Sequence, residues 1–350
     1  MKVLHLVYSF RTGGIETMLV NIANEQAKLG HEIFIVVLND NIDKALLNRL
    51  DANVNFICLG KKLGSHSPLC VLKLNYYIAR ISPDIIHLHY SGIYKLIILP
   101  KFKRKCCVTS HDVCVFPYCK SLIGIKHIFA ISNVVKEDLM NKLHLNSELV
   151  LNGIDVESFK HAKKSRTSFF RIVVISRLMH SKKGQDVLIQ ALGKVFKKGI
   201  GNFQLDIIGE GPSLEFLRNL VAENGLSSKI NFLGNKSQNY LFEHLCEYDL
   251  CVQPSRYEGF GLTVAEAMAA KVPVLVSANE GPLEIIDNGR YGFYFNNGDV
   301  DDCARALVNI ISNGVDACMI ESAYNRVKTM YNVQNTARTY LHKYECISGK

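Results

Sequence analysis

The sequence lacks the features that mark membrane-spanning, zinc-binding and disulfide-rich proteins. No uninterrupted apolar stretch reaches the roughly 18 residues that a transmembrane helix needs. The first apolar segment ends at Arg11 and is too short for the hydrophobic region of a secretory signal. The 11 cysteines form no Cys-x-x-Cys pair and no Cys/His array with zinc spacing, so we expect reduced cysteines in the core. These absences predict a cytoplasmic protein.

Solenoid-length repeats, low-complexity tracts and the Gly-x-Gly-x-x-Gly fingerprint of NAD-binding proteins are also missing. Asp40 could imitate the acid that binds an NAD ribose, but without the glycines a dehydrogenase is disfavoured. What is present is a chain of 350 residues, 48% hydrophobic and 21% charged. This composition is typical of a globular protein, and the length suffices for two domains of about 100 to 200 residues each.

Apolar runs of strand length alternate with helical stretches, and this alternation predicts parallel sheets covered by helices on both faces. The expected strands are residues 2–7, 33–38, 54–59, 84–89, 106–109, 127–131 and 148–151, followed by 171–176, 204–208, 230–233, 249–253, 272–277 and 292–295. A basic stretch without apolar periodicity, residues 161–168, separates the two series. We therefore expect Rossmann-like domains at residues 1–160 and 161–330, with ligands at the carboxyl ends of the strands in a cleft between the domains.

The net charge of +9 is unevenly distributed along the chain. Residues 1–160 contain 19 Lys/Arg against 13 Asp/Glu, and no acid occurs between Asp84 and Asp112. Basic and apolar residues interleave over 94–105, a mixture that suits an anionic membrane surface. A solvated loop would give the same pattern, because runs of like charge are usually exposed. We expect a peripheral contact with the inner face of the cell membrane and no nucleic-acid partner.

The segment Glu258–Glu266 carries the most informative pattern. Two carboxylates eight positions apart bracket a glycine-rich turn between an expected strand and an expected helix at 262–270. Backbone N–H groups at a helix N-terminus bind anions, and glycine lets a phosphate approach closely. The segment can therefore hold a phosphate with an acid on either side. A solvated Glu258 and an ordinary helix-surface Glu266 would give the same pattern.

Three weaker motifs also follow expected strands. Gly13-Gly14 precedes a helix and could bind an anion or simply form a tight turn. Residues 174–186 include Arg177, Lys182 and Lys183, a cation cluster that matches a diphosphate, although surface charges on a loop would look alike. His111 could position a sugar or relay a proton, but a lone loop histidine is more often structural.

In order and spacing these motifs resemble the retaining glycosyltransferases with the GT-B fold. The resemblance covers nearly the whole chain and is carried by Gly13-Gly14 with Glu16, His111-Asp112, Ile131-Ser132, Asn152–Asp155, Ser176–Gly184, Ile208–Pro212 and Glu258–Glu266. It implies an α/β protein of two doubly wound domains, with a C-terminal helix at 331–350 that crosses back to the first domain. It also implies catalysis without a metal or cofactor. One departure is Glu280-Gly281, where many members have two glycines.

The resemblance implies a division of roles around a nucleotide diphosphate sugar. Glu258 would bind hydroxyls of the donor sugar, Glu266 would bind the nucleotide ribose, and His111 would contact the sugar near the reacting carbon. Arg177 and a lysine would neutralise the departing diphosphate. Lys182 has the usual distance from the arginine and Lys183 the usual place beside the glycine, so both are candidates. The other donor contacts would come from backbone groups of Gly14, Phe260, Gly261 and Leu262.

The implied reaction moves a hexose or N-acetylhexosamine, with a UDP-sugar favoured as donor. The acceptor would be a glycan, polyprenyl-diphosphate-linked, in bacterial O-antigen, capsule or related polysaccharide synthesis. Two other functions remain open from the sequence: a nucleotide-sugar 2-epimerase of the same fold, and a non-catalytic subunit that binds nucleotide sugar.

Overall fold

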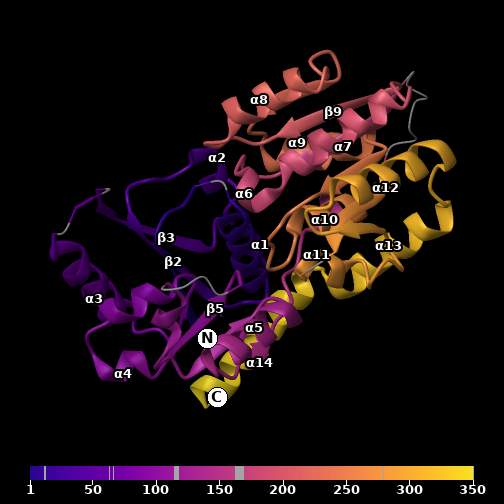
Figure 1. Ribbon diagram of the computed structural model, residues 1–350. Helices are drawn as coiled ribbons and strands as arrows, with labels where there is room; N and C mark the ends of the chain where they lie inside the picture. The colour runs from indigo at the N-terminus through magenta and orange to yellow at the C-terminus, as the bar shows by residue number, and fades with distance from the viewer. Residues whose placement is uncertain are drawn as a thin grey trace. The chain divides into compact units, whose positions relative to one another are not determined.

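The computed structural model describes residues 1–11, 13–62, 64–65, 67–113, 118–161, 169–278 and 280–349. The chain divides into two compact units, each built on a parallel sheet (Figure 1). The first unit comprises Met1–Ile154 and Asn332–Lys350, and the second comprises Asp155–Tyr331.

The first unit contains a seven-stranded sheet with the order β3-β2-β1-β4-β5-β6-β7. All of its paired strands are parallel. The strands are β1 (Lys2–Val7), β2 (Glu32–Asn39), β3 (Val54–Lys61), β4 (Ile85–Leu88), β5 (Cys106–Ser110), β6 (His127–Ala130) and β7 (Glu148–Leu149). Central strands of this sheet are buried along nearly their full length, which explains why they read as continuous apolar runs in the sequence.

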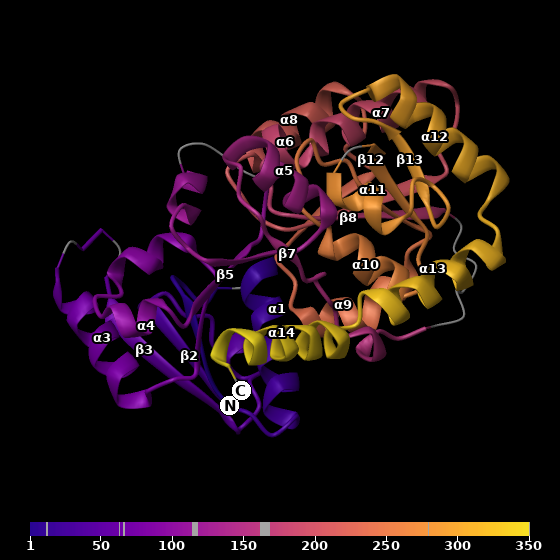
Figure 2. The same cartoon turned by 90° about the horizontal axis from the view of Figure 1, so that it is seen from below.

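Helices from both ends of the chain complete the first unit. They are α1 (Gly14–Lys28), α2 (Lys44–Leu47), α3 (Leu69–Ile81), α4 (Pro100–Lys103), α5 (Asn133–Leu143) and α14 (Val333–Ser348), with 3₁₀ turns η1 (Ser91–Leu96) and η2 (Tyr118–Leu122). Figure 2 shows α14 in yellow beside α1. Tyr340 and Tyr344 of α14 are fully buried. Their hydroxyls lie 2.9 Å from Thr109 Oγ1 and 2.6 Å from His87 Nδ1, so the last helix forms part of this core.

The second unit contains a six-stranded parallel sheet with the order β10-β9-β8-β11-β12-β13. Its strands are β8 (Phe170–Ile175), β9 (Phe203–Ile208), β10 (Ile230–Gly234), β11 (Leu250–Gln253), β12 (Val274–Ala278) and β13 (Phe293–Asn296). Its helices are α6 (His180–Lys183), α7 (Gln185–Lys197), α8 (Leu214–Glu223), α9 (Gln238–His244), α10 (Leu262–Ala269), α11 (Glu280–Ile285), α12 (Val300–Asn313) and α13 (Ala317–Met330), with 3₁₀ turns η3 (Val156–Ser158) and η4 (Leu245–Glu247).

These elements confirm the predicted fold class of two Rossmann-like α/β domains, and each of the thirteen expected strands is present. The division between the units lies at residues 154/155, six residues before the predicted boundary at 160/161. Residues 155–160 belong to the second unit because Phe159 packs edge-on against Phe242, with ring centroids 4.9 Å apart, and Lys160 N donates to the Phe242 carbonyl at 2.9 Å. Most of the predicted linker, residues 162–168, lies outside the described residues.

The expectation that the cysteines are core residues is wrong at three positions. Cys58, Cys318 and Cys346 are exposed, whereas the other seven described cysteines are buried. All ten are free thiols.

Helix α12 illustrates how the second unit uses its helices. Asp299 caps the N-terminus by accepting a hydrogen bond from Asp302 N at 2.9 Å, and Leu307 and Ile310 pack in the apolar core.

In the described part of the chain, no single helix has both the length and the apolar composition of a membrane span. Only α12 and α13 taken together meet those criteria, and the pair is bent by 116° at the break between them.

Candidate active site

The motifs of the second unit converge at the carboxyl ends of β8 and β11, which are neighbours in the sheet. Arg177 and Lys183 follow β8, and Glu258 follows β11. Because the strands are parallel, both loops leave the same edge of the sheet. Lys183 and Glu258, 75 positions apart in the sequence, therefore come together.

Lys183 and Glu258 form the central contact of this edge. Lys183 Nζ lies 2.5 Å from Glu258 Oε2, and each side chain is 19% exposed. Gln253 Nε2 donates to the same carboxylate oxygen at 2.9 Å, while Thr263 Oγ1 donates to Gln253 Oε1 at 2.9 Å. Glu258 is thus held by a cation and an amide, which excludes a freely solvated side chain. Gln253 is a site residue that the sequence analysis missed, since a buried strand-end glutamine has no motif of its own.

The two neighbouring lysines make different contacts. The Lys182 carbonyl accepts hydrogen bonds from Arg256 N at 2.8 Å and Tyr257 N at 3.3 Å, which ties the loop after β8 to the loop after β11. Next to the lysines, Gly184 has a φ of +65°, and a Cβ there would lie 1.8 Å from the Pro254 carbonyl oxygen. Only glycine allows this approach of the two backbones. The approach places the Lys183 side chain against Glu258.

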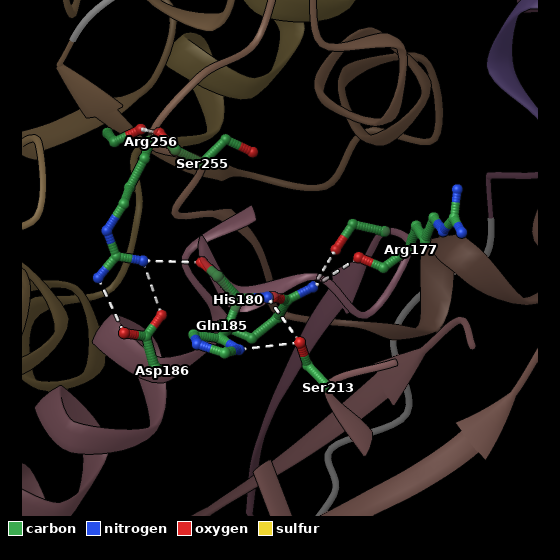
Figure 3. A network of polar contacts seen from close by, with 9 residues as sticks. Arg177, His180, Gln185, Asp186, Ser213, Ser255 and Arg256 are labelled. Carbon is green, nitrogen blue, oxygen red and sulfur yellow. Dashed lines mark hydrogen bonds and ion pairs between the residues drawn. The ribbon is translucent and has the colours of Figure 1, made fainter. Parts of the chain in front are cut away.

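A polar network of Arg256, Asp186 and Ser213 holds the short helix α6 through its first residue, His180 (Figure 3). The Arg256 guanidinium makes two 2.8 Å hydrogen bonds to the Asp186 carboxylate and a third to the His180 carbonyl. The hydrogen bonds that the guanidinium donates to Asp186 raise the pKa of Arg256 against the opposing effect of burial. Ser213 Oγ accepts from His180 N at 3.1 Å and lies 2.8 Å from His180 Nδ1. Arg256 was not predicted as a site residue, although it stands two positions before Glu258.

Arg177 does not join the Lys183–Glu258 pair in this structure. Its carbonyl accepts from Gln185 Nε2 at 2.9 Å, while its exposed guanidinium extends away from the network in Figure 3. Its hydrogen-bonding capacity is therefore directed outward from the second unit.

Helix α10 starts at the predicted anion-binding turn. Gly261 is its N-cap with a φ of +99°, in the left-handed region that favours glycine. The turn from Phe260 to Leu262 leaves N–H groups at a helix N-terminus, where backbone amides favour an anion. The Phe260 side chain is buried edge-on against Tyr331 and anchors the turn. The structure thus provides amides, a lysine and a carboxylate at one edge, a set that suits a diphosphate attached to a hydroxylated group.

Glu266 is buried, which rules out the alternative of an ordinary helix-surface residue. It is only 7% exposed, and its Oε1 accepts a hydrogen bond from Gln238 Nε2 at 2.8 Å.

The departure from the family pattern at Glu280-Gly281 has a partial explanation. A Cβ at Gly281 would lie 2.4 Å from Phe260 Cα, so the retained glycine is the one that packing requires. The Glu280 side chain lies outside the described residues.

The first unit has its own polar edge at the carboxyl ends of β1, β4 and β5. Gly14 begins α1, and Glu16 in the first turn of that helix is 6% exposed. Glu16 Oε1 accepts hydrogen bonds from Tyr90 Oη at 3.2 Å and Ser9 Oγ at 3.5 Å. Burial raises the pKa of Glu16. A Cβ at Gly13 would lie 2.9 Å from Glu16 Oε2, so this glycine makes room for the carboxylate.

His111 at this edge is not a lone histidine. His5, His87 and His89 are buried beside it. Residue 87 in β4 pairs in register with residue 5 in β1, and residue 89 directly follows the end of β4. Burial lowers the pKa of His5 to about 4 and that of His111 to about 3, and holds the pKa values of His87 and His89 well below their ordinary range. All four rings are neutral at pH 7. The sequence analysis missed this cluster because its members come from three strands.

His5, His87 and His89 are also the described residues closest to a metal-ligand set, with ring nitrogens within 4.8 Å of one another. Each of the six nitrogens already has a protein partner. Gln26, Thr109 and Tyr344 bind three of them, and the others join the rings to one another or to His111. A metal ion would have to displace these hydrogen bonds, so hydrogen bonding gives a sufficient account of the cluster.

The chain matches the sequence models of two glycosyltransferase families. The family model for glycosyl transferases group 1 matches residues 155–326, and that for glycosyltransferase family 4 matches residues 12–158. A GDP-mannose-dependent α-(1-6)-phosphatidylinositol monomannoside mannosyltransferase of Mycobacterium tuberculosis is 29% identical over 175 residues, 45% of either chain. The chain spans about half the length of several curated relatives that it matches.

Solved structures show the same fold over nearly the whole chain. Anabaena HepE, solved in complex with UDP-glucose, has a TM-score of 0.83 at 21% identity and covers 99% of this chain and 100% of its own. The lipopolysaccharide outer core galactosyltransferase WaaB has a TM-score of 0.75 at 20% identity over 99% of this chain and 100% of its own. The two family models together span residues 12–326. The chain therefore belongs to the group 1 glycosyltransferases and has the two parallel-sheet units of the GT-B fold.

Proposed function

We propose that this protein transfers a hexose or N-acetylhexosamine from a nucleotide diphosphate sugar to a polyprenyl-diphosphate-linked oligosaccharide, with retention of the anomeric configuration and without a metal. A UDP-sugar is the favoured donor, and bacterial surface polysaccharide is the favoured product. The observation that supports this most directly is the Lys183–Glu258 pair beside the amides that open α10. HepE and WaaB, of the same fold, add support for the donor and for the product class.

In the proposed reaction, the bond between the anomeric carbon and the diphosphate oxygen breaks, and its electron pair leaves with the diphosphate. The acceptor hydroxyl oxygen forms the new bond on the same face, and its proton passes to the departing diphosphate. Negative charge on the leaving group must be stabilised in the transition state. Lys183, the amides of α10 and Arg177 supply positive charge, with Lys182 as a second candidate beside Lys183.

Two carboxylates would hold the rest of the donor. Glu258 would bind the sugar hydroxyls rather than attack the anomeric carbon, since Lys183 and Gln253 already fix its carboxylate. Glu266 would bind the ribose, with Gln238 orienting its carboxylate. In the first unit, His111 would contact the sugar, and the turn at Gly14 would approach the diphosphate.

A thermal-shift screen tests the donor. UDP-glucose, UDP-galactose, UDP-N-acetylglucosamine, GDP-mannose and ADP-glucose are each added to the full chain. A ligand at 100 times its dissociation constant adds about 2.7 kcal/mol of stability. The shift should disappear in a Glu258→Ala, Arg177→Ala double variant. It should persist in Glu215→Ala, Arg218→Ala, a pair exposed on α8. A sugar nucleotide that is epimerised without an acceptor, or equal turnover by the site variant, would contradict the proposal.

The proposed membrane contact involves the α3 surface patch, which we define as Leu69, Leu72, Tyr76, Ile98 and Leu99. All five side chains are between 41% and 59% exposed. Asn75 joins the two segments, since its Nδ2 donates to the Leu96 carbonyl and its Oδ1 accepts from Ile98 N, both at 2.9 Å. The segment of residues 52–111, which includes the patch, contains nine Lys/Arg and one acid, Asp84, a net charge of +8, while the chain as a whole carries +9. Apolar side chains amid positive charge complement an anionic lipid surface.

Cosedimentation with vesicles that contain anionic lipid tests this contact. Binding should occur at low salt and weaken at high salt, because the attraction is screened. A Leu72→Ser, Ile98→Ser variant and a Lys101→Gln, Lys103→Gln variant should both bind less. Met140→Ser on α5, another exposed apolar residue, serves as the control. Binding that is absent, or independent of salt, would refute the contact.

A further inference from the structure

A continuous hydrogen-bond chain runs through the first unit from α1 to the end of β5. Gln26 Oε1 lies 2.8 Å from His5 Nε2, His5 Nδ1 lies 3.1 Å from His89 Nε2, and His89 Nδ1 lies 3.1 Å from His111 Nε2. We call Gln26, His5, His89 and His111 the histidine chain. Its inner end is fully buried, while His111 is half-buried at the polar edge of the sheet.

Neutral rings make this chain directional. Burial keeps His5, His89 and His111 uncharged at neutral pH, so each imidazole carries one proton. A neutral imidazole donates from one nitrogen and accepts at the other. Because both nitrogens of His5 and of His89 lie in the chain, the protons can be arranged in only two ways. Either every ring is protonated at Nε2, or every ring is protonated at Nδ1.

Gln26 decides between the two arrangements. The amide is oriented with its oxygen toward His5 Nε2, and an amide oxygen can only accept, so in this orientation His5 carries its proton there. His5 Nδ1 then accepts from His89 Nε2, and His89 Nδ1 accepts from His111 Nε2. The proton of His111 is therefore directed into the protein. Its Nδ1 keeps a lone pair, the atom at the end of the histidine chain.

We propose that Gln26, His5 and His89 are positioning residues that fix His111 in the Nε2-protonated tautomer and present His111 Nδ1 as a hydrogen-bond acceptor for a hydroxyl group. The identity of that hydroxyl, a sugar hydroxyl of the donor, rests on the function proposed above. The tautomer itself rests on the hydrogen bonds, on the neutral charge of the buried rings and on the Gln26 oxygen that faces His5. An unprotonated Nδ1 accepts a hydrogen bond, so it selects a ligand group that donates. In the other tautomer Nδ1 would carry a proton, and it would either need the same hydroxyl to accept or be left without an acceptor.

The need to satisfy buried polar groups does not by itself set the direction of the protons in the chain. His87 shows what that requirement alone produces. Its Nε2 contacts Thr109 Oγ1 at 2.7 Å and its Nδ1 contacts Tyr344 Oη at 2.6 Å, and hydroxyls can donate or accept, so its tautomer is not imposed. The histidine chain instead ends on an amide whose oxygen, in the orientation of this structure, faces His5, and this orientation sets one direction. His87 is a side branch whose ring lies tilted against that of His89, with ring centroids 4.4 Å apart and an interplanar angle of 33°.

Nitrogen-15 NMR of the full chain with labelled histidine tests the tautomer directly, because protonated and unprotonated ring nitrogens differ widely in chemical shift. The His111 signals, among those of 12 histidines, are identified by their loss in His111→Gln. The matched control, His342→Gln on the exposed face of α14, should remove a different set. We expect unprotonated Nδ1 and protonated Nε2 for His5, His89 and His111 at pH 7. A protonated Nδ1 on His111 in the wild-type protein overturns the inference, whether or not any variant folds.

Two substitutions of Gln26 test its control over His111. Gln26→Met keeps the side-chain length but removes the acceptor, so a substantial share of His111 should become protonated at Nδ1. Gln26→Glu restores an oxygen and should restore the wild-type tautomer. If Gln26→Met folds and leaves the tautomer of His111 unchanged, the inference is wrong.

Turnover separates this inference from the proposed function. With a donor found in the thermal-shift screen, kcat/KM should fall about tenfold in Gln26→Met, the value of one misdirected hydrogen bond, and recover in Gln26→Glu. Wild-type tautomers as expected together with no sugar-nucleotide binding would leave the histidine chain standing and refute the transferase proposal. Transferase activity with the reverse tautomer would do the opposite.

Discussion

Replacing Lys183 by methionine perturbs the central contact of the proposed donor site. The variant keeps most of the side-chain length and loses the charge. Glu258 then retains the hydrogen bond from Gln253 Nε2 but loses the cation 2.5 Å away. Both side chains are 19% exposed, so solvent screens part of the attraction. The expected loss in the free energy of unfolding lies between those of exposed and buried ion pairs, at about 1 to 2 kcal/mol.

The effect on turnover should be larger than the effect on stability. Negative charge on the diphosphate grows as the anomeric bond breaks, so a cation at this point stabilises the transition state more than the bound donor. Loss of one such charge-stabilising group typically costs about 100- to 1000-fold in kcat. We therefore expect kcat to fall by about this factor in Lys183→Met, while KM for the donor changes much less.

Release of free nucleotide from the donor found in the screen measures turnover, and urea unfolding measures stability. Lys194→Met is the matched control, since Lys194 pairs with Asp301 at 2.6 Å but the two side chains are 45% and 67% exposed. It should leave both the free energy of unfolding and the turnover nearly unchanged, because water screens an exposed pair. Turnover of Lys183→Met within threefold of wild type would refute the reasoning, and a selective loss in Lys182→Met would assign the diphosphate to that lysine instead.

Three further predictions concern the scaffold. Arg256→Met should lower the free energy of unfolding by about 2 kcal/mol, because it leaves Asp186 without its bidentate partner, and thermal shifts with the donor should shrink with it. Gly184→Ala should cost about 3 kcal/mol or more in urea unfolding, since its Cβ would lie 1.8 Å from the Pro254 oxygen at a positive φ, and Gly199→Ala, also at positive φ but in open space, should cost less. Stability should also fall as the pH drops from 6.5 toward 4. In this range His5 of the unfolded chain becomes protonated, whereas the buried His5 of the folded protein stays neutral until about pH 4. His5 alone accounts for about 3 kcal/mol, and a His5→Gln variant with a flatter pH profile would support this, whereas an unchanged profile would contradict it.

The sequence predicted the strands and the placement of the motifs because both depend on local pattern. Parallel strands buried on both faces must be apolar runs, and loops with glycine must follow them where ligands approach. For this reason the local pattern alone was enough to assign Glu258, Arg177 and His111 to strand ends. The sequence pattern singled out Gly184 beside its lysines. The group that requires a glycine there, the Pro254 carbonyl oxygen, could be identified only in the structure.

The choice of partners depended on contacts between segments far apart in the chain. Lys182 and Lys183 are equivalent in the sequence, and the direction of the single turn α6 decides which side chain meets Glu258. Arg256 and Gln253 belong to no pattern, since each is defined only by the group that it binds.

The amino-acid sequence by itself determined the two-unit α/β fold and the motif order, because these follow from periodicity and spacing along the chain. It indicated the family through the resemblance that its motifs carry. The tertiary structure decided the charge partner of Glu258, the burial of Glu266 and the joining of α14 to the first core. It also assembled the histidine chain from residues 5, 26, 89 and 111. Hydrogen bonds and ion pairs act over about 3 Å in space, and only folding brings such separated residues within that distance.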